Sequence, residues 1–82
     1  MDREKIIDEL IPIFKETLEN DDLTIRETDS SETIDGWDSL IHILLISEIE
    51  SHFGIKIPVN QIQNMKSVSA MVDVIVELTT NS

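Results

Sequence analysis

Ser39 is the residue whose neighbours first suggest chemistry, because Asp38 precedes it and His42 follows three positions later. A nucleophilic serine needs a base within hydrogen-bond reach, and residues three apart share one face of a helix. The run 36–40 nevertheless lacks the glycine that follows the serine in the Gly-x-Ser-x-Gly elbow. We therefore expect no catalytic residue here, and we interpret His42 and His52 as ordinary residues of a helix surface.

The sequence also lacks the residue patterns that are typical of metal sites. The chain has two histidines, no cysteine and no His-Glu-x-x-His spacing. A calcium loop that began at Asn20 would need glycine at its sixth position and glutamate at its twelfth, where Ile25 and Ser31 stand instead. We expect no metal site, and we interpret the acidic run as a solvated segment.

Asp38 and Ser39 lie directly before an apolar segment and are both residue types that favour the N-cap of a helix. One interpretation is that they only cap this helix. Another is that the free amide N–H groups and the partial positive charge of a helix N-terminus would stabilise a phosphate attached to the Ser39 hydroxyl. The two residues by themselves leave both interpretations open.

Length and charge limit the function classes. The 82 residues predict a single domain over 1–82, and 6 basic against 17 acidic residues give a net charge of −11. That charge argues against binding nucleic acid or an anionic membrane, and it favours a monomer. No apolar run approaches the roughly 18 residues of a membrane span, and the N-terminus does not resemble a secretory signal, so we expect a cytoplasmic protein.

A long, acidic connection spans residues 20–38. The segment 19–38 holds eight acids against the single Arg26, whereas only four acids follow Ser39. Such a loop is usually functional or held by its own apolar side chains. The candidates for that role are Leu23, Ile25, Ile34 and Trp37.

Apolar spacing predicts a small antiparallel bundle of three long helices and one short helix, an all-α fold with the long loop between the first two helices. The first helix is expected at 3–19, capped by Asp2 and bent at Pro12, and the second at 39–53, ended by Gly54. A short helix at 59–65 and a last helix capped by Ser67 follow, with a frayed tail at 79–82. The expected core positions are Ile7, Leu10, Ile11, Phe14 and Leu18, then Ile43, Ile46, Ile49 and Phe53, then Ile62 and Met65, and finally Val68, Met71, Val72, Ile75 and Leu78.

Three segments together resemble the acyl carrier protein family. They are Asp35-Gly36-Trp37-Asp38-Ser39-Leu40 before an apolar helix, Phe53-Gly54-Ile55-Lys56-Ile57-Pro58 beginning 14 residues after the serine, and Val68-Ser69-Ala70-Met71-Val72 at the last helix. The resemblance covers almost the whole chain. It implies a carrier, not an enzyme, in which Ser39 bears 4′-phosphopantetheine transferred from coenzyme A by a phosphopantetheinyl transferase.

The resemblance also implies roles for the neighbours of Ser39. Asp38 corresponds to the acid that positions the serine, Gly36 permits a tight turn, and Leu40 lies beside the arm. Acyl-loading and acyl-processing enzymes are the implied partners. The residues expected to dock them are Leu40, Ile43, Leu44 and Glu50. For Leu40, partial burial in the core is an equally open interpretation, whereas Trp37 is expected to cover the end of the bundle.

The chain departs from carriers of bacterial fatty acid synthesis, in which acids are common where Ile41 and Leu44 stand here. The Gly-Trp-Asp-Ser-Leu form resembles carriers of polyketide, nonribosomal-peptide or other specialised pathways. The main alternative is an acidic adaptor that docks a partner through its second helix, with Ser39 only a helix cap. A nucleic-acid mimic is a weaker alternative, because the acids are confined to one loop and one helix.

Overall fold

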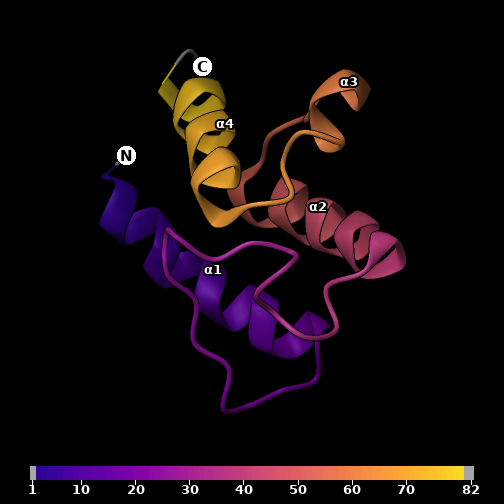
Figure 1. Cartoon of the computed structure of the whole chain (residues 1–82). Helices are drawn as coiled ribbons and strands as arrows, with labels where there is room; N and C mark the ends of the chain where they lie inside the picture. The colour runs from indigo at the N-terminus through magenta and orange to yellow at the C-terminus, as the bar shows by residue number, and fades with distance from the viewer. Residues whose placement is uncertain (1, 81–82) are drawn as a thin grey trace.

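The structure, a computed structural model, describes residues 2–80, and over that range it contains four helices (Figure 1). They are α1 (Arg3–Thr17), α2 (Ser39–Phe53), α3 (Val59–Ile62) and α4 (Val68–Thr80). In Figure 1, α1 and α2 run in roughly opposite directions, and α4 is steeply inclined to both; α1 is in contact with α2 and with α4. The all-helical prediction, with three long helices and one short helix, is confirmed.

Helix α1 begins at the predicted cap, since the Asp2 side chain accepts a hydrogen bond from the Glu4 N–H at 3.2 Å. It continues through Pro12 and ends at Thr17, two residues earlier than predicted, with Glu19 in a left-handed conformation at φ 53°. The predicted core face was wrong by part of a turn. The residues buried against α2 and α4 are Ile6, Leu10, Ile13 and Phe14, whereas Ile7, Ile11 and Leu18 are half-buried at its edges.

Helix α2 has the predicted bounds and the predicted stop, with Gly54 in the left-handed region at φ 66° and its N–H donating to the Glu50 carbonyl. Its core face differs from the prediction. The buried residues are His42, Leu45, Ile46 and Ile49, while Ile43 is 51% exposed. The interpretation of His42 as a surface residue is therefore wrong. Because α2 is apolar on almost every side, its periodicity does not indicate which face the other helices cover.

The long loop 20–38 is held in place by its own buried side chains and by backbone hydrogen bonds to the link before α4. Ile25, Ile34 and Trp37 are buried, as predicted, and Leu23 is half-buried against the same core. The loop is also joined to the link before α4, because Ser31 N–H donates to the Lys66 carbonyl and Val68 N–H donates to the Asp29 carbonyl, both at 2.9 Å. These two bonds form an isolated antiparallel bridge between Ser30 and Ser67. The loop is thus packed on the core through its own apolar side chains and joined to the link before α4 by backbone hydrogen bonds.

The short helix α3 stops three residues before its predicted end, so Met65 lies in the following link, where it is fully buried. Ser67 caps α4 as predicted, because its hydroxyl oxygen accepts a hydrogen bond from the Ala70 N–H at 3.1 Å. The predicted interior positions of α4 are buried, except for Leu78, which is half-buried. Helix α4 runs through Thr80, so the predicted frayed tail was wrong for residues 79 and 80, and residues 81–82 lie outside the described part of the chain.

Candidate functional site

Ser39 is the first residue of α2, and Asp38 is its N-cap. The Asp38 carboxylate accepts a hydrogen bond from the Ile41 N–H at 2.9 Å, and the Asp38 carbonyl accepts one from the His42 N–H at 2.8 Å. Since Asp38 supplies the cap, the hydroxyl of Ser39 is not needed for it. Ser39 is exposed, and within residues 2–80 its hydroxyl has no hydrogen-bond partner. The hydroxyl is therefore free to be modified without disrupting the helix.

Two residues before the cap, Gly36 adopts φ 89°, a left-handed conformation that side-chain-bearing residues rarely adopt. A Cβ at this position would meet only Leu18 Cδ2, at 3.7 Å, so the conformation and not crowding explains the glycine. The turn lets Trp37 point into the core while Asp38 and Ser39 remain exposed. This is the tight turn expected of Gly36.

Trp37 and His42 form a buried hydrogen-bonded pair beneath Ser39. Trp37 is 4% exposed and His42 is 2% exposed, and the Trp37 Nε1–H donates to His42 Nδ1 at 3.0 Å. The two ring planes differ by 25° with centroids 5.9 Å apart, which fits an in-plane hydrogen bond better than face-to-face stacking. Trp37 also meets the edge of Phe14, with ring centroids 5.2 Å apart. Trp37 therefore packs the end of the long loop onto the core, and its covering of the end of the bundle stays a prediction.

This pair determines which nitrogen of His42 carries the proton. The indole N–H can only donate, so Nδ1 must accept, and Nε2 must donate to the Ile62 carbonyl 2.7 Å away. His42 is then a neutral side chain that joins the end of the long loop, the first turn of α2 and the end of α3. It holds the frame around Ser39, and with both ring nitrogens occupied it is not available as a base.

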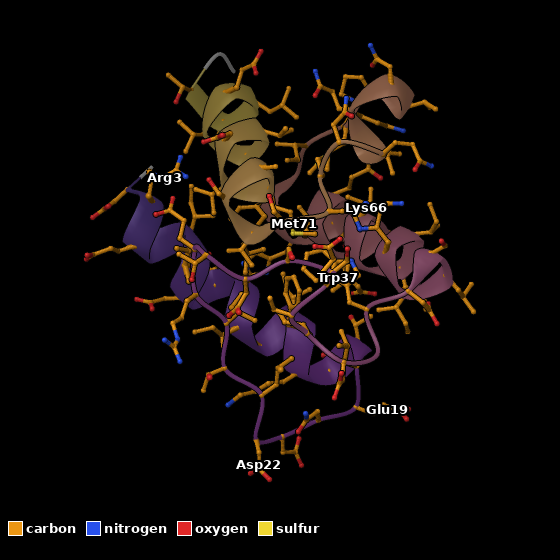
Figure 2. The ribbon with its side chains drawn as sticks, viewed as in Figure 1. Arg3, Glu19, Asp22, Trp37, Lys66 and Met71 are labelled. Carbon is orange, nitrogen blue, oxygen red and sulfur yellow. The ribbon has the colours of Figure 1, made fainter. Side chains whose placement is uncertain are left out.

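An open pocket of about 140 Å³ lies beside Ser39. It is formed by the loop, the start of α2 and the link before α4; its lining residues are Ser31, Trp37, Asp38, Ser39, His42 and Lys66. Figure 2 shows Lys66 and Trp37 on the same side of the molecule, near the first half of α2. A cavity of about 150 Å³ can hold a benzene-sized group, so this one has room for a substituent on the serine.

The predicted docking residues on α2 are mostly solvent-exposed. Leu40 is 70% exposed, Ile43 51% and Leu44 46%, and these three positions lie on one side of the helix. We refer to Leu40, Ile43 and Leu44 as the apolar patch. The exposure of Leu40 shows that it is not a core residue. Glu50 is half-buried, and its carboxylate accepts a hydrogen bond from the Ile57 N–H at 2.8 Å, which ties the link after α2 to the helix.

Sequence reasoning missed three residues that the fold brings to this site. His42 carried a usable signal, since an isolated histidine in an apolar helix five residues after the only tryptophan is a candidate for a buried polar pair. Lys66 and Ser31 carried none, because they are 35 positions apart in the sequence and meet only through the bridge between the loop and the last link.

Two further findings concern the described residues. Across residues 2–80, no group of three or more His, Asp or Glu side chains is arranged to hold a metal ion. Over the same range, no helix has the length and apolar character needed to cross a membrane.

Known proteins provide an independent comparison. The family model described as a phosphopantetheine attachment site matches residues 8–75. The holo acyl carrier protein of Geobacter metallireducens, solved by NMR, is 32% identical, with a TM-score of 0.83 over 92% of this chain and 86% of that one. The crystal structure of an acyl carrier protein from Thermotoga maritima is 25% identical, with a TM-score of 0.86 over 99% of this chain and 94% of that one. No curated protein sequence matches the chain significantly.

The prosthetic group of this family fits the residues around Ser39. A free, exposed hydroxyl at the head of α2 stands next to an open pocket, which leaves space for a phosphodiester and the arm beyond it. The adaptor interpretation, in which Ser39 is only a cap, explains neither the family match nor the finding that Asp38 is the cap. The chain belongs to the acyl carrier protein family, and it is a carrier with covalently attached phosphopantetheine, not an enzyme.

Proposed function

We propose that Ser39 is the attachment residue and that the protein carries acyl groups between the enzymes of a biosynthetic pathway. The observation that supports this most strongly is the free, exposed Ser39 hydroxyl within the matched span 8–75. Ser39 differs from the other exposed serines of α2, Ser47 and Ser51, because it stands at the head of the helix and lines the pocket. Two serines outside α2 have hydroxyls that are already engaged. The Ser30 hydroxyl accepts a hydrogen bond from the Glu32 N–H, and the Ser67 hydroxyl caps α4.

The attachment reaction uses the chain only as a nucleophile. The Ser39 oxygen attacks the phosphorus of coenzyme A that bears pantetheine, the bond from that phosphorus to the oxygen of the nucleotide phosphate breaks, and 3′,5′-ADP leaves. The hydroxyl proton passes to the transferase or to solvent. A phosphopantetheinyl transferase supplies the catalysis, while Asp38 and the Gly36 turn hold the hydroxyl outward at the head of α2. The arm supplies a terminal thiol, which holds acyl groups as thioesters and which this cysteine-free chain lacks.

The partners that this function requires are the transferase and the acyl-loading and acyl-processing enzymes. The apolar patch is their docking surface on α2. Glu50 contributes less to docking, because one of its carboxylate oxygens already accepts a hydrogen bond from the Ile57 N–H. Ile41 and Leu44 stand where carriers of bacterial fatty acid synthesis commonly have acids, so polyketide, nonribosomal-peptide or another specialised synthesis is the favoured pathway. We further propose a single domain that acts as a cytoplasmic monomer.

The attachment site is tested by intact mass after incubation with coenzyme A, Mg²⁺ and a broad-specificity phosphopantetheinyl transferase. The wild-type chain should gain one phosphopantetheinyl group, and Ser39→Ala should gain none. Ser51→Ala is the matched control, because Ser51 is another exposed serine of α2, and it should load like the wild type. Absence of loading on a folded wild-type chain would refute the carrier function, and loading of Ser39→Ala would refute the site.

The docking surface is tested by the rate of the same reaction. Leu44→Ala should lower kcat/KM about fivefold, because the few central residues that anchor an interface cost about 1 kcal/mol or more when truncated. Val59→Ala is the control: Val59 is 82% exposed but belongs to α3 and not to the patch. Equal rates for both variants would exclude the patch as the transferase contact.

A further inference from the structure

The pocket beside Ser39 contains two hydrogen-bond donors that the fold leaves unused. Within residues 2–80, neither the Lys66 ammonium nor the Ser31 hydroxyl has a hydrogen-bond or ion-pair partner. Both residues line the pocket from the wall opposite α2, one from the long loop and one from the link before α4. Their donors are therefore available to a group that enters from Ser39.

The backbone that carries these donors is held in place. Ser31 N–H donates to the Lys66 carbonyl at 2.9 Å, so the two residues are joined directly. The neighbouring bond from Val68 N–H to the Asp29 carbonyl completes the bridge between Ser30 and Ser67. The start of the Lys66 side chain is thus held beside Ser31, even though Lys66 as a residue is exposed.

Electrostatics explains why a cation is needed at this position. A phosphodiester on Ser39 carries a negative charge and would lie beside the Asp38 carboxylate, on a chain whose net charge is already −11. Asp38 is partly compensated by the Ile41 N–H that it accepts. Among the lining residues, His42 is neutral because its Nδ1 accepts from Trp37, so Lys66 is the positive charge of the pocket.

We infer that Lys66 and Ser31 form a subsite that binds the phosphodiester of the prosthetic group and holds the start of the arm against the link before α4. This inference rests on the proposed attachment at Ser39. The Lys66 ammonium offsets the charges of the phosphodiester and Asp38, and the Ser31 hydroxyl donates to a phosphate oxygen. The pocket of about 140 Å³ is large enough for the phosphodiester but not for the whole arm, so the thiol end remains free to reach partner enzymes.

The test compares loaded and unloaded forms of four chains: wild type, Lys66→Gln, Lys66→Arg and the control Lys56→Gln. Lys56 is another exposed lysine, lies outside the pocket and gives the same change in charge. Each chain is loaded to completion, as checked by intact mass, and its melting temperature is measured before and after loading. The change in melting temperature on loading should be less favourable by about 2–5 °C in Lys66→Gln than in the wild type, because the phosphodiester then lacks its cationic partner.

The other variants make the result specific. Lys56→Gln and Lys66→Arg should respond to loading as the wild type does, and the difference shown by Lys66→Gln should vanish in about 1 M salt, where charges are screened within about 3 Å. In two-dimensional NMR, loading should shift the Ser31 and Lys66 amide signals in the wild type and less in Lys66→Gln. Full loading with equal responses in Lys66→Gln and Lys56→Gln would refute the subsite and leave the carrier function intact. Failure of every chain to load would refute the carrier function itself.

Discussion

Replacing His42 with leucine should destabilise the protein far more than the same change at the other histidine. His42 is 2% exposed, accepts a hydrogen bond from Trp37 and donates one to the Ile62 carbonyl. Leucine fills a similar space but removes both bonds. The indole N–H and the Ile62 carbonyl then lose their partners in the interior.

The expected loss follows from these two groups. A buried polar group left without a partner costs about 1–3 kcal/mol, and the half-buried Ile62 carbonyl can regain part of this from water. The free energy of unfolding should therefore fall by about 2–4 kcal/mol. An 82-residue domain has roughly 4–12 kcal/mol in total, so the loss is a large fraction of its stability.

Urea unfolding followed by far-ultraviolet circular dichroism measures this loss. An unchanged slope of the unfolding free energy against urea concentration would show that the fold is unchanged. The control is His52→Leu. His52 pairs with Glu9 on the surface at 3.0 Å, and such a pair contributes at most about 1 kcal/mol. If the two substitutions cost the same within about 0.5 kcal/mol, the buried pair has no special role and the reasoning is refuted.

A double-mutant cycle separates the hydrogen bond from packing. Trp37→Phe removes the donor, and combining it with His42→Leu removes the donor and the acceptor together. The combined cost should be smaller than the sum of the single costs by about 1–2 kcal/mol, because no N–H then remains unpaired. Strict additivity would show that Trp37 and His42 act independently.

Three further outcomes are expected. Asp38→Ala should lower the free energy of unfolding in urea by about 0.5–2 kcal/mol and Ser39→Ala by much less, since the Asp38 carboxylate is the cap; the reverse order would contradict this geometry. Gly54→Ala should lower the free energy of unfolding by about 1–2 kcal/mol in the same assay. The loss comes from the backbone, since φ is 66° and an added Cβ meets no atom within 4 Å; an unaltered stability would mean that the helix ends differently. The melting temperature should rise with NaCl or Mg²⁺, because residues 19–38 hold eight acids and one basic residue, and Arg3 of α1 pairs with only one of these acids, Glu27. A flat or falling melting temperature in calorimetry would exclude self-repulsion.

The amino-acid sequence alone determined the features that depend on near neighbours. A cap at Asp38 or Ser39, the stop at Gly54, the cap at Ser67 and the number of helices follow from residue types within a few positions of one another. The structure confirms them and assigns the first cap to Asp38. The motif around Ser39, together with the segments 53–58 and 68–72, was also sufficient to indicate the family, because each of these segments is continuous in the sequence. Short-range chemistry of this kind is the same whatever the rest of the chain does.

The tertiary structure decided which faces are buried and which distant residues meet. Helix α2 is apolar on most sides, so only its packing on α1 shows that His42 is inside and Ile43 is outside. On α1 the prediction was right for Leu10 and Phe14 but missed Ile6 and Ile13, because isoleucine stands both at the buried centre of this face and at its half-buried edges. Lys66 and Ser31 reach the serine only because the long loop folds back onto the last link. Segments so far apart in the sequence meet because the fold as a whole has its lowest free energy in that arrangement. No short stretch of sequence contains that information.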